Sequence, residues 1–338
     1  MRQYHLNYKH EYYFNCSKMK MKISVIIPVY NAEKFVSQAV ESALQFEEVY
    51  EVILIEDKSP DNALQVCQQL TEKYERVKLY QHPDKGNHGA GPTRNLGMTK
   101  ATGDFLAFLD ADDYYLPNRF DAEKVLFEDS DVEGVYGALG VHYYSDKAKE
   151  QYYHLFGDRL TTVYKRHHPK DVFFGQMHML GPFGLFSIDA LTIRREPLVK
   201  KMDIWFKGHL RLHEDTEFLF RLSYYLNLYP GITDKAVAVR GVHENNRITK
   251  VDTRIINPAI TKGLLWQEVH NWAEKEGTVS EDAKIHIKRI LRSFEIAKAP
   301  KIKKWRMVMK YLVTDYPSIR SGLYNVNFKH SLFFNIKK

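Results

Sequence analysis

The sequence predicts an α/β fold: a doubly wound, mostly parallel sheet with a C-terminal helical appendage. Strand-like and helix-like segments alternate four times over residues 22–110, polar clusters follow three of those strands, and helical periodicity returns after Pro258. Alternating strands and helices form parallel sheets covered by helices on both faces. A chain of 338 residues has room for one large domain and an appendage.

The alternation begins with residues 23–29, a nearly continuous run of apolar residues that is typical of a buried parallel strand. Apolar residues within 35–44 then recur on one face of a helix. Residues 52–55 form a second strand. Ser59-Pro60 then supplies an N-cap and a proline at the first helical position, so the next helix is expected to begin there.

The pattern continues with a third strand at 77–80, a third helix at 91–101 and a fourth strand at 105–109. Residues 142–185 are rich in His, Tyr, Phe and Gly without a clear period. Such a stretch fits either a substrate-facing region or a surface excursion. Residues 255–338 return to helical spacing and are expected to form a basic helical C-terminal region.

Polar clusters lie where three of the predicted strands end. They are Pro28-Val29-Tyr30-Asn31, Glu56-Asp57-Lys58-Ser59 and Asp110-Ala111-Asp112-Asp113. Because ligands of such sheets bind at the carboxyl ends of the strands, the three clusters are expected to converge. Divalent cations such as Mg²⁺ are bound through one or two carboxylates and phosphate oxygens. The convergence therefore favours a metal and nucleotide diphosphate site over a merely charged turn.

Composition excludes several classes of protein. Two cysteines, Cys16 and Cys67, cannot form a disulfide framework or a metal clip, which suits a reducing cytoplasm. No run of apolar residues approaches the ~20 needed to span a membrane. Residues 1–21 are polar, contain no signal-peptide core, and are expected to be a disordered leader.

The net charge of +7 is concentrated in the C-terminal region. From Glu281 to Lys338 there are 14 Lys and Arg but only 4 Asp and Glu, interleaved with apolar and aromatic residues. Two interpretations stay open: a segment that lies on an anionic membrane surface, and ordinary amphipathic helices packed on the rest of the protein. No nucleic-acid-binding motif accompanies the charge, so no nucleic-acid partner is expected.

Taken together, these motifs resemble the inverting nucleotide-sugar glycosyltransferases of glycosyltransferase family 2, which have the GT-A fold. The resemblance covers residues 22 to about 245 and rests on motifs in the family's order: 25–31, 55–62, 91–97, 102–113 and His213-Glu214-Asp215. It implies a GT-A catalytic domain at 22–254, with a nucleotide-binding half at 22–138 and an acceptor half at 139–254.

The resemblance also implies roles for residues that would bind the nucleotide. Asp57 would accept a hydrogen bond from the base, which favours uracil over cytosine, and Arg94 would close over the base or diphosphate. Lys58 departs from the family, which usually has Gly there, and puts the conformation of this loop in question. The implied nucleotide-binding residues are Pro28, Tyr30, Asn31, Glu33, Asp57, Arg94, Asp110 and Ala111.

For the chemistry, the resemblance implies Asp215 as the general base, with Glu214 beside it. Asp112 and His243 would hold a divalent metal, Mn²⁺ or Mg²⁺. The implied enzyme transfers a sugar from a UDP-sugar to a glycan or lipid-linked glycan acceptor of the surface polysaccharide, capsule or lipopolysaccharide type. It would be cytoplasmic, and peripheral on the inner face of the cell membrane if the basic tail docks there.

Three other functions compete with this one. A dinucleotide-dependent oxidoreductase is excluded because the first strand is not followed by Gly-x-Gly-x-x-Gly. A nucleotidyltransferase would normally carry a glycine-rich triphosphate loop near the first strand, and none is present there. A non-catalytic nucleotide-sugar-binding protein stays open. The sequence does not indicate the sugar, the linkage or the oligomeric state.

Overall fold

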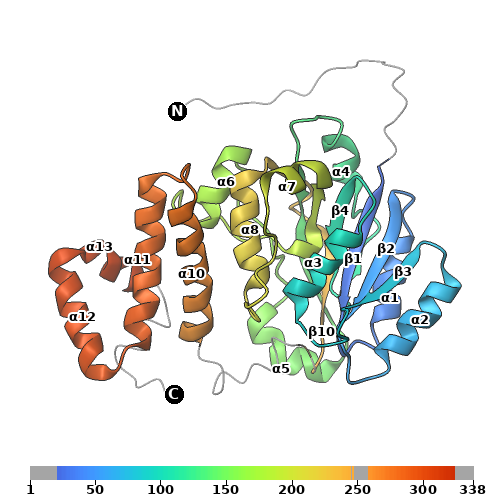
Figure 1. The fold of residues 1–338 in the computed structure, drawn as a ribbon, viewed down its shortest axis with the longest axis horizontal. Helices are drawn as coiled ribbons and strands as arrows, with labels where there is room; N and C mark the ends of the chain where they lie inside the picture. The colour runs from blue at the N-terminus through green and yellow to red at the C-terminus, as the bar shows by residue number, and fades with distance from the viewer. Residues whose placement is uncertain (1–20, 245, 247–257, 324–338) are drawn as a thin grey trace.

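The computed structural model describes residues 21–244, 246 and 258–323. Nearly all of the predicted leader, residues 1–21, lies outside the described residues, as do residues 324–338 of the C-terminal region. Figure 1 shows a sheet with helices on its faces at one end of the molecule and a group of helices at the other. Among the described residues, none of the helices is both long and apolar enough to cross a bilayer.

The strands form two sheets. They are β1 (Ile23–Val29), β2 (Val49–Glu56), β3 (Val77–Gln81), β4 (Phe105–Phe108), β5 (Tyr114–Tyr115), β6 (Gly134–Tyr136), β7 (Ala138–Tyr143), β8 (Leu191–Arg194), β9 (Leu228–Pro230) and β10 (Ala236–Val242). The main sheet has the order β3-β2-β1-β4-β8-β6-β9, and the small sheet has the order β5-β10-β7. Only β8 runs antiparallel to its neighbours in the main sheet, so the predicted mostly parallel sheet is confirmed.

The helices and one short 3-10 turn connect these strands or follow them. They are α1 (Val36–Leu44), α2 (Ala63–Lys73), α3 (Ala90–Lys100), α4 (Asp121–Leu126), α5 (Asp146–Phe156), α6 (Pro169–Gln176), η1 (Ile188–Ala190), α7 (Arg195–Lys201), α8 (Glu214–Tyr225), α10 (Pro258–Lys275), α11 (Glu281–Lys298), α12 (Lys301–Thr314) and α13 (Tyr316–Leu323). The stretch 142–185, which showed no clear period, therefore contains α5 and α6.

Both faces of the main sheet are buried, which explains why its strands read as continuous apolar runs. Val25 and Ile27 of β1 pack in one core with the apolar sides of α1 and α2. Ile26, which points to the opposite face, packs in a second core with Met98 of α3 and Phe218 of α8. The doubly wound arrangement is thus confirmed.

One predicted helix start was wrong. The helix expected to begin at Ser59-Pro60 begins at Ala63, with Asn62 at the N-cap position. The Ser59 hydroxyl instead accepts a hydrogen bond from the backbone N–H of Asn31, 3.2 Å away. The first helical N–H, that of Ala63, donates instead to Oδ1 of Asp61 at 3.2 Å.

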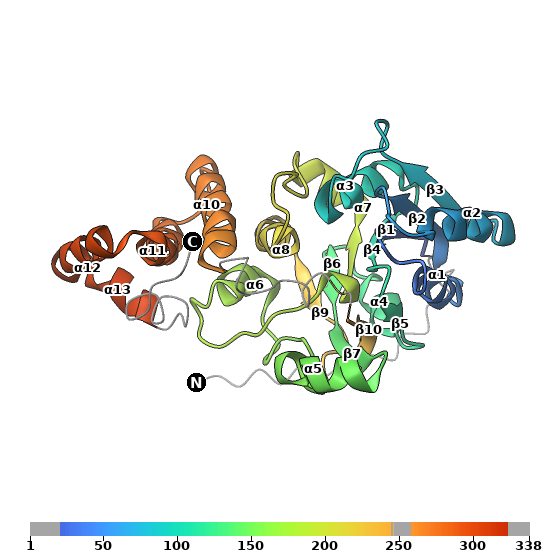
Figure 2. The ribbon, with the colours of Figure 1, turned by 90° about the horizontal axis from the view of Figure 1, so that it is seen from below.

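The C-terminal helices pack on the α/β unit through a third core. Leu265 and Val269 of α10 and Ile287 of α11 meet Phe173 of α6 and Phe220 of α8. Figure 2 shows α10 beside α8 and α6, with α12 farther from the sheet. The predicted helical appendage is therefore present, and its first two helices are part of the folded core.

Candidate active site

The carboxyl ends of β1, β2 and β4 meet at one edge of the main sheet, as the sequence predicted. Val29 of β1 lies opposite Glu56 of β2, and Ile26 lies opposite Phe108 of β4, so the segments that follow the three strands emerge side by side. After β4 the chain makes a turn over Asp110–Asp113, closed by a 3.0 Å hydrogen bond from the N–H of Asp113 to the carbonyl of Asp110.

The small sheet brings the two predicted metal ligands together. Nε2 of His243, just after β10, lies 3.2 Å from Oδ2 of Asp112, and Nδ2 of Asn246 donates to the same oxygen at 2.7 Å. The His243 ring stacks on Phe35, with ring centroids 4.3 Å apart. A Cβ at Gly241 would lie 2.0 Å from the carbonyl oxygen of Asp112, so only glycine allows β10 to approach this turn.

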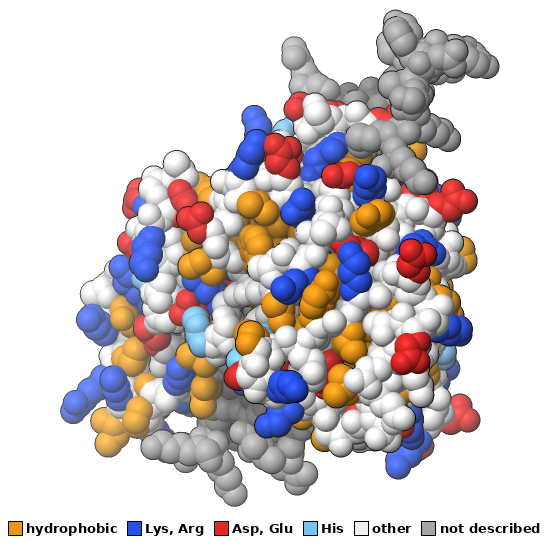
Figure 3. Space-filling model, turned by 45° about the vertical axis from the view of Figure 1, so that its right-hand side comes forward, with side chains coloured by type: hydrophobic (Ala, Val, Ile, Leu, Met, Phe, Trp, Pro, Cys, Tyr) orange, Lys and Arg blue, Asp and Glu red, His pale blue; other side chains and the backbone are white. Residues whose placement is uncertain are grey.

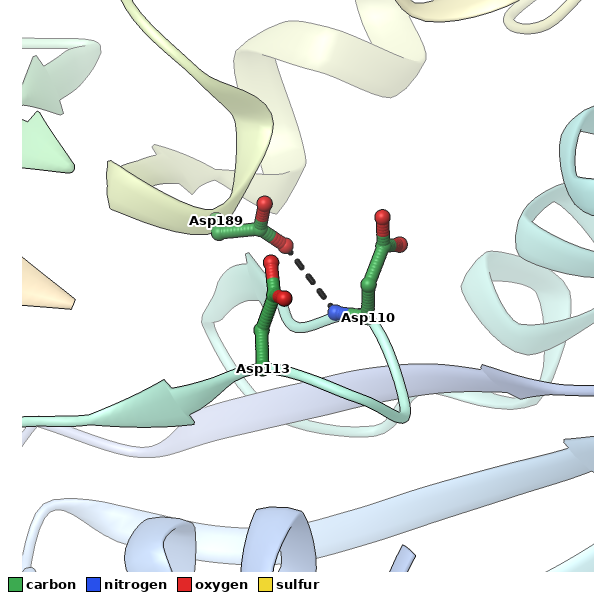
Figure 4. A group of neighbouring side chains, drawn as sticks. All are labelled: Asp110, Asp113 and Asp189. Atoms are coloured by element: carbon green, nitrogen blue, oxygen red, sulfur yellow. Dashed lines mark hydrogen bonds between the residues drawn. The ribbon is translucent and has the colours of Figure 1, made fainter. Parts of the chain in front are cut away.

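Two further carboxylates, for which the sequence indicated no individual role, lie at this turn. Asp113 accepts from the N–H of Gly241 at 2.9 Å, and Asp189 accepts from the N–H of Asp110 at 2.9 Å. One oxygen from each of Asp110, Asp113 and Asp189 lies within 4.8 Å of the other two. Figure 4 shows the carboxylates of Asp113 and Asp189 next to each other above the turn.

The sequence indicates Asp113 and Asp189 to different degrees. Asp113 belongs to the aspartate cluster that the sequence singled out, whereas Asp189 stands alone in an apolar segment. Asp189 reaches the site because β8 pairs antiparallel with β4, which places the start of β8 at the carboxyl end of β4. Nothing in the local sequence predicts that pairing.

Two aspartates at this turn, Asp113 and Asp189, are buried, and burial raises the pKa of a carboxyl group. Burial and the charges of Asp189, Asp112 and Asp110 raise the pKa of Asp113 well above its usual value. Burial and the charge of Asp110 raise the pKa of Asp189 to about 6, although Arg94 and Arg240 act in the opposite direction. Burial and the neighbouring negative charges therefore both disfavour the charged forms of these two carboxyl groups.

Arg94 of α3 connects the aspartate turn to the start of α8. Its Nη2 lies 2.5 Å from Oδ1 of Asp110, and its Nη1 lies 3.6 Å from Oε1 of Glu214. Burial lowers the pKa of Arg94, but the nearby charges of Asp110, Glu214 and Asp215 outweigh it and raise the pKa. Arg94 is 3% exposed and contacts these two protein carboxylates, and its predicted role over the base or diphosphate stays a prediction.

The two predicted catalytic carboxylates are both on the first turn of α8 but differ in environment. Glu214 is buried against Arg94, whereas Asp215 is partly exposed and accepts from the N–H of Thr216 at 2.7 Å. His213, which precedes them, has a left-handed φ of 64°. A non-glycine residue in that conformation is uncommon and is often found at functional sites.

Asp57, which is predicted to contact the base, holds a neighbouring loop in place through hydrogen bonds. Its carboxylate accepts from the N–H groups of His88 and Gly89, at 2.7 and 2.8 Å, and from Nδ2 of Asn87 at 3.0 Å. Lys58, where the family usually has glycine, adopts a left-handed φ of 58°. The departure from the family pattern therefore keeps the glycine-like backbone, at a cost of roughly 1–2 kcal/mol.

The other predicted nucleotide-binding residues surround this edge. Tyr30 is exposed, Pro28 is partly buried, and Ala111, within the aspartate turn, is buried. Asn31 has a left-handed φ of 53°. Glu33 accepts from the backbone N–H and the Nδ2 of Asn62, both at 3.3 Å, so it joins the loop after β1 to the start of α2.

The carboxylate and imidazole groups at the aspartate turn are suitable ligands for a divalent cation. The carboxylates of Asp110 and Asp112 are 41% and 29% exposed, so solvent and a ligand can reach them, while Asp113 and Asp189 are buried behind them. Carboxylate oxygens suit Mg²⁺ and Mn²⁺, and an imidazole nitrogen beside them adds a ligand that binds transition metals well. The assignment of Asp112 and His243 as metal ligands stays a prediction.

Comparison with known proteins identifies the family. The sequence profile of "Glycosyl transferase family 2" matches residues 24–201, more than half of the chain. The chain belongs to this family. The matched segment includes the aspartate turn, Arg94 and Asp189, whereas Asp215 and His243 lie beyond it.

Several curated glycosyltransferases are similar to parts of the chain. A poly(ribitol-phosphate) beta-glucosyltransferase of Bacillus spizizenii is 26% identical over 204 residues, 59% of this chain and 29% of that protein. The poly(ribitol-phosphate) beta-N-acetylglucosaminyltransferase TarS of Staphylococcus aureus is 26% identical over 222 residues, 64% of this chain and 35% of TarS. An uncharacterized glycosyltransferase of Nostoc sp. is 38% identical over 138 residues, 39% of this chain and 40% of that protein. The chain thus spans less than half the length of these relatives.

Solved structures share the fold. A crystal structure of S. aureus TarS 1-349 in complex with UDP-GlcNAc has a TM-score of 0.58 and 20% identity, covering 92% of this chain and 82% of that chain. The mannosyltransferase PcManGT from Pyrobaculum calidifontis, in complex with GDP-Man and Mn²⁺, has a TM-score of 0.51 and 13% identity, covering 92% and 86%. The predicted GT-A fold is therefore confirmed for this member of glycosyl transferase family 2.

Proposed function

We propose that the protein transfers a sugar from a UDP-sugar to a hydroxyl group of a glycan acceptor, with inversion at the anomeric carbon. The observation that carries the proposal is the position of Arg94. Arg94 contacts Asp110 of the turn at the sheet edge and Glu214 at the start of α8. The negative charge of Asp215 lies near enough to help raise the pKa of Arg94. A diphosphate at the turn and a hydroxyl near Asp215 would therefore share one site.

In the proposed reaction the acceptor oxygen bonds to the anomeric carbon while the bond from that carbon to the diphosphate oxygen breaks. UDP leaves with the bonding electrons, and Asp215 accepts the proton of the attacking hydroxyl. Glu214, buried against Arg94, would orient the start of α8 instead of touching the acceptor. Asp110 would hold the ribose, and Asp57 and the loop after β1 would hold the base.

Asp112 and His243 would hold the divalent metal, which supplies positive charge to the diphosphate of the leaving group. Asn246 donates to Asp112 and would keep that carboxylate oriented. The structural neighbour PcManGT was solved with GDP-Man and Mn²⁺, which supports the proposal of a metal that acts together with the nucleotide.

The relatives also support the substrate classes. TarS was solved with UDP-GlcNAc, which favours a uridine nucleotide over the guanosine nucleotide bound by PcManGT. TarS and the B. spizizenii enzyme are named for transfer to poly(ribitol-phosphate). The proposed acceptor is accordingly a surface polysaccharide, capsule or lipopolysaccharide-type glycan, free or lipid-linked.

Substitution of the base tests the chemistry. Asp215→Asn should leave the affinity for UDP with Mn²⁺ unchanged and lower the rate of sugar transfer by roughly 10² to 10⁴-fold, the contribution of a positioned general base. The matched control is Asp282→Asn. It changes the same residue type at the same position in a Glu-Asp pair at the start of a helix, α11, and should behave as wild type.

Two results would contradict the proposal. Near-normal transfer by Asp215→Asn would require another base, and a product that retains the donor's anomeric configuration in NMR spectra would exclude single displacement. Binding of UDP-sugars without sugar release to any glycan acceptor would instead favour a nucleotide-sugar-binding protein. Release of pyrophosphate from UTP and a sugar phosphate would favour a nucleotidyltransferase.

A further inference from the structure

Helix α12 carries its apolar side chains on the face that points to solvent. Ile302, Met309 and Val313 are 74%, 62% and 87% exposed, and Trp305 is 43% exposed. Their spacing of three, four and four residues places them on one side of the helix. An exposed apolar stripe on a helix of a folded protein usually marks an interaction site.

The opposite face of α12 packs on the neighbouring helices. The exposure of its apolar side chains is therefore a property of a firmly packed helix. Val308 packs with Ile296 of α11 and Ile319 of α13. Asp315, between α12 and α13, is paired with Arg292 of α11, and Arg289 lies 3.4 Å from it. These contacts fix which face of α12 points outward.

Cationic side chains border the apolar stripe. Lys303, Arg306 and Lys310 are exposed and follow one edge of it, at helical positions between the stripe and the buried face. No acidic residue lies within α12. Figure 3 shows hydrophobic and basic side chains together at the lower left, over the end of the molecule where Figure 1 places α12.

We propose that the outward face of α12 docks on an anionic lipid surface, with the apolar stripe in the interface and Lys303, Arg306 and Lys310 against the headgroups. A helix with an apolar face, basic flanks and aromatic residues binds membranes in this way. A second copy of the chain fits less well, because stripe-to-stripe packing would bring the same three cations of both copies together. The surface lies at the end of the molecule opposite the sheet and is separate from the proposed catalytic site.

The fluorescence of Trp305 can report vesicle binding. On mixing the full-length protein with vesicles of phosphatidylcholine and phosphatidylglycerol, its emission should shift to shorter wavelength and be quenched by brominated lipid. Vesicles of phosphatidylcholine alone should produce neither effect, and raised salt should reverse both. The variant Trp305→Phe assigns the signal, because the other three tryptophans are in other helices or loops and should not respond.

Two sets of variants separate the apolar and charged contributions. The double variant Met309→Ser and Val313→Ser should abolish the quenching while leaving UDP affinity unchanged; Val125→Ser and Val199→Ser, at exposed positions of α4 and α7, are the matched control. Replacing Lys303, Arg306 and Lys310 by Gln should weaken vesicle binding roughly 10²-fold, about fivefold for each charge. The same change at Lys147, Lys170 and Lys275, exposed on other helices, should have little effect.

Equal binding to neutral and anionic vesicles, or unchanged binding of the Met309 and Val313 variant, would overturn the proposal. So would a dimer of the wild-type protein that becomes monomeric in that variant, since the stripe would then be an interface between copies. None of these results depends on catalysis, so they leave the proposed glycosyl transfer untouched.

Discussion

Single buried residues hold the sheet together far from the proposed active site, and Glu51 is the best example. Its Oε1 accepts from Oγ of Ser24 at 2.7 Å and from the N–H and Oγ1 of Thr102 at 2.7 and 2.8 Å. Its Oε2 lies 2.6 Å from Nζ of Lys78. One carboxylate thus joins the beginnings of β1, β2 and β3 to the segment before β4.

The pKa of Glu51 predicts how this contribution depends on pH. Burial raises the pKa, but hydrogen bonds from Lys78, Ser24 and Thr102 outweigh it and lower the pKa overall. A carboxyl whose pKa is lower in the folded state stabilises the fold above its unfolded pKa of about 4.3. That stabilisation is lost as the pH falls through the folded-state pKa.

We therefore expect Glu51→Gln to lower the free energy of unfolding by about 1–3 kcal/mol at neutral pH, because hydrogen bonds to a charged acceptor become weaker. Below the unfolded pKa of about 4.3 the difference from wild type should shrink, and it should vanish once the pH is below the lowered folded-state pKa, where Glu51 is neutral. Urea unfolding at several pH values measures it. Glu75→Gln, at an exposed position, is the control, and an equal effect from both variants at neutral pH would contradict the prediction.

At the scale of elements, the contact of α3 with β1 and β2 sets the position of Arg94. Gly97, one turn after Arg94, faces the sheet so closely that a Cβ there would lie 2.4 Å from Cγ2 of Ile26 and 3.4 Å from Cγ1 of Ile55. A methyl group cannot fit without moving the helix or the strand. The missing side chain is what allows α3 to pack close enough for Arg94 to reach Asp110.

Gly97→Ala should therefore destabilise the protein by about 1–3 kcal/mol through overpacking, despite the better helix propensity of Ala. It should also weaken the binding of UDP with Mn²⁺, because α3 carries Arg94. Gly277→Ala is the matched control, since a Cβ there meets nothing within 4 Å. A Gly97→Ala variant as stable as the control in urea unfolding would show that α3 has room to move.

At the scale of the whole molecule, the C-terminal helices divide into two parts with different roles. Helices α10 and α11 complete a core with Phe173, Met177 and Phe220 of the α/β unit. Oγ1 of Thr261 on α10 also lies 3.3 Å from Nε2 of His213, next to the proposed catalytic pair. Helices α12 and α13 instead pack on α11. The predicted boundary of a catalytic domain at residue 254 therefore stays a prediction about function and not a boundary of the folded core.

Two truncations should behave differently. Ending the chain after Asn257 removes α10 to α13 and exposes the third core, which α10 and α11 cover in the full chain. We therefore expect this protein to aggregate or to bind a hydrophobic dye, and to lack a cooperative thermal transition. Ending it after Ala299 removes α12 and α13 but leaves that core covered. This shorter chain should keep a cooperative transition and bind UDP. A stable, cooperative chain ending at Asn257 would contradict the packing described here.

The sequence by itself determined the features that depend on local periodicity. Continuous apolar runs predicted the parallel strands, the helical period predicted α1 to α3, and the polar residues after three strands predicted the edge where the candidate site lies. The proximity of Asp112 and His243 was also predicted, through the family resemblance, and the structure brings the two together. The strands, the helices and the sheet edge could be predicted because neighbouring residues carry the whole signal, whereas the proximity of Asp112 and His243, 131 residues apart, followed only from the resemblance.

Only the tertiary structure decided the rest. Asp189 reaches the aspartate turn through the antiparallel pairing of β8, and Arg94 lies between Asp110 and Glu214 because α3 packs against both. For α12, periodicity shows which residues share a face but not which face is buried. Packing on α11 and α13 buries Val308 and leaves Val313 in solvent. Such outcomes depend on contacts between segments far apart in the chain, and local pattern carries no information about them.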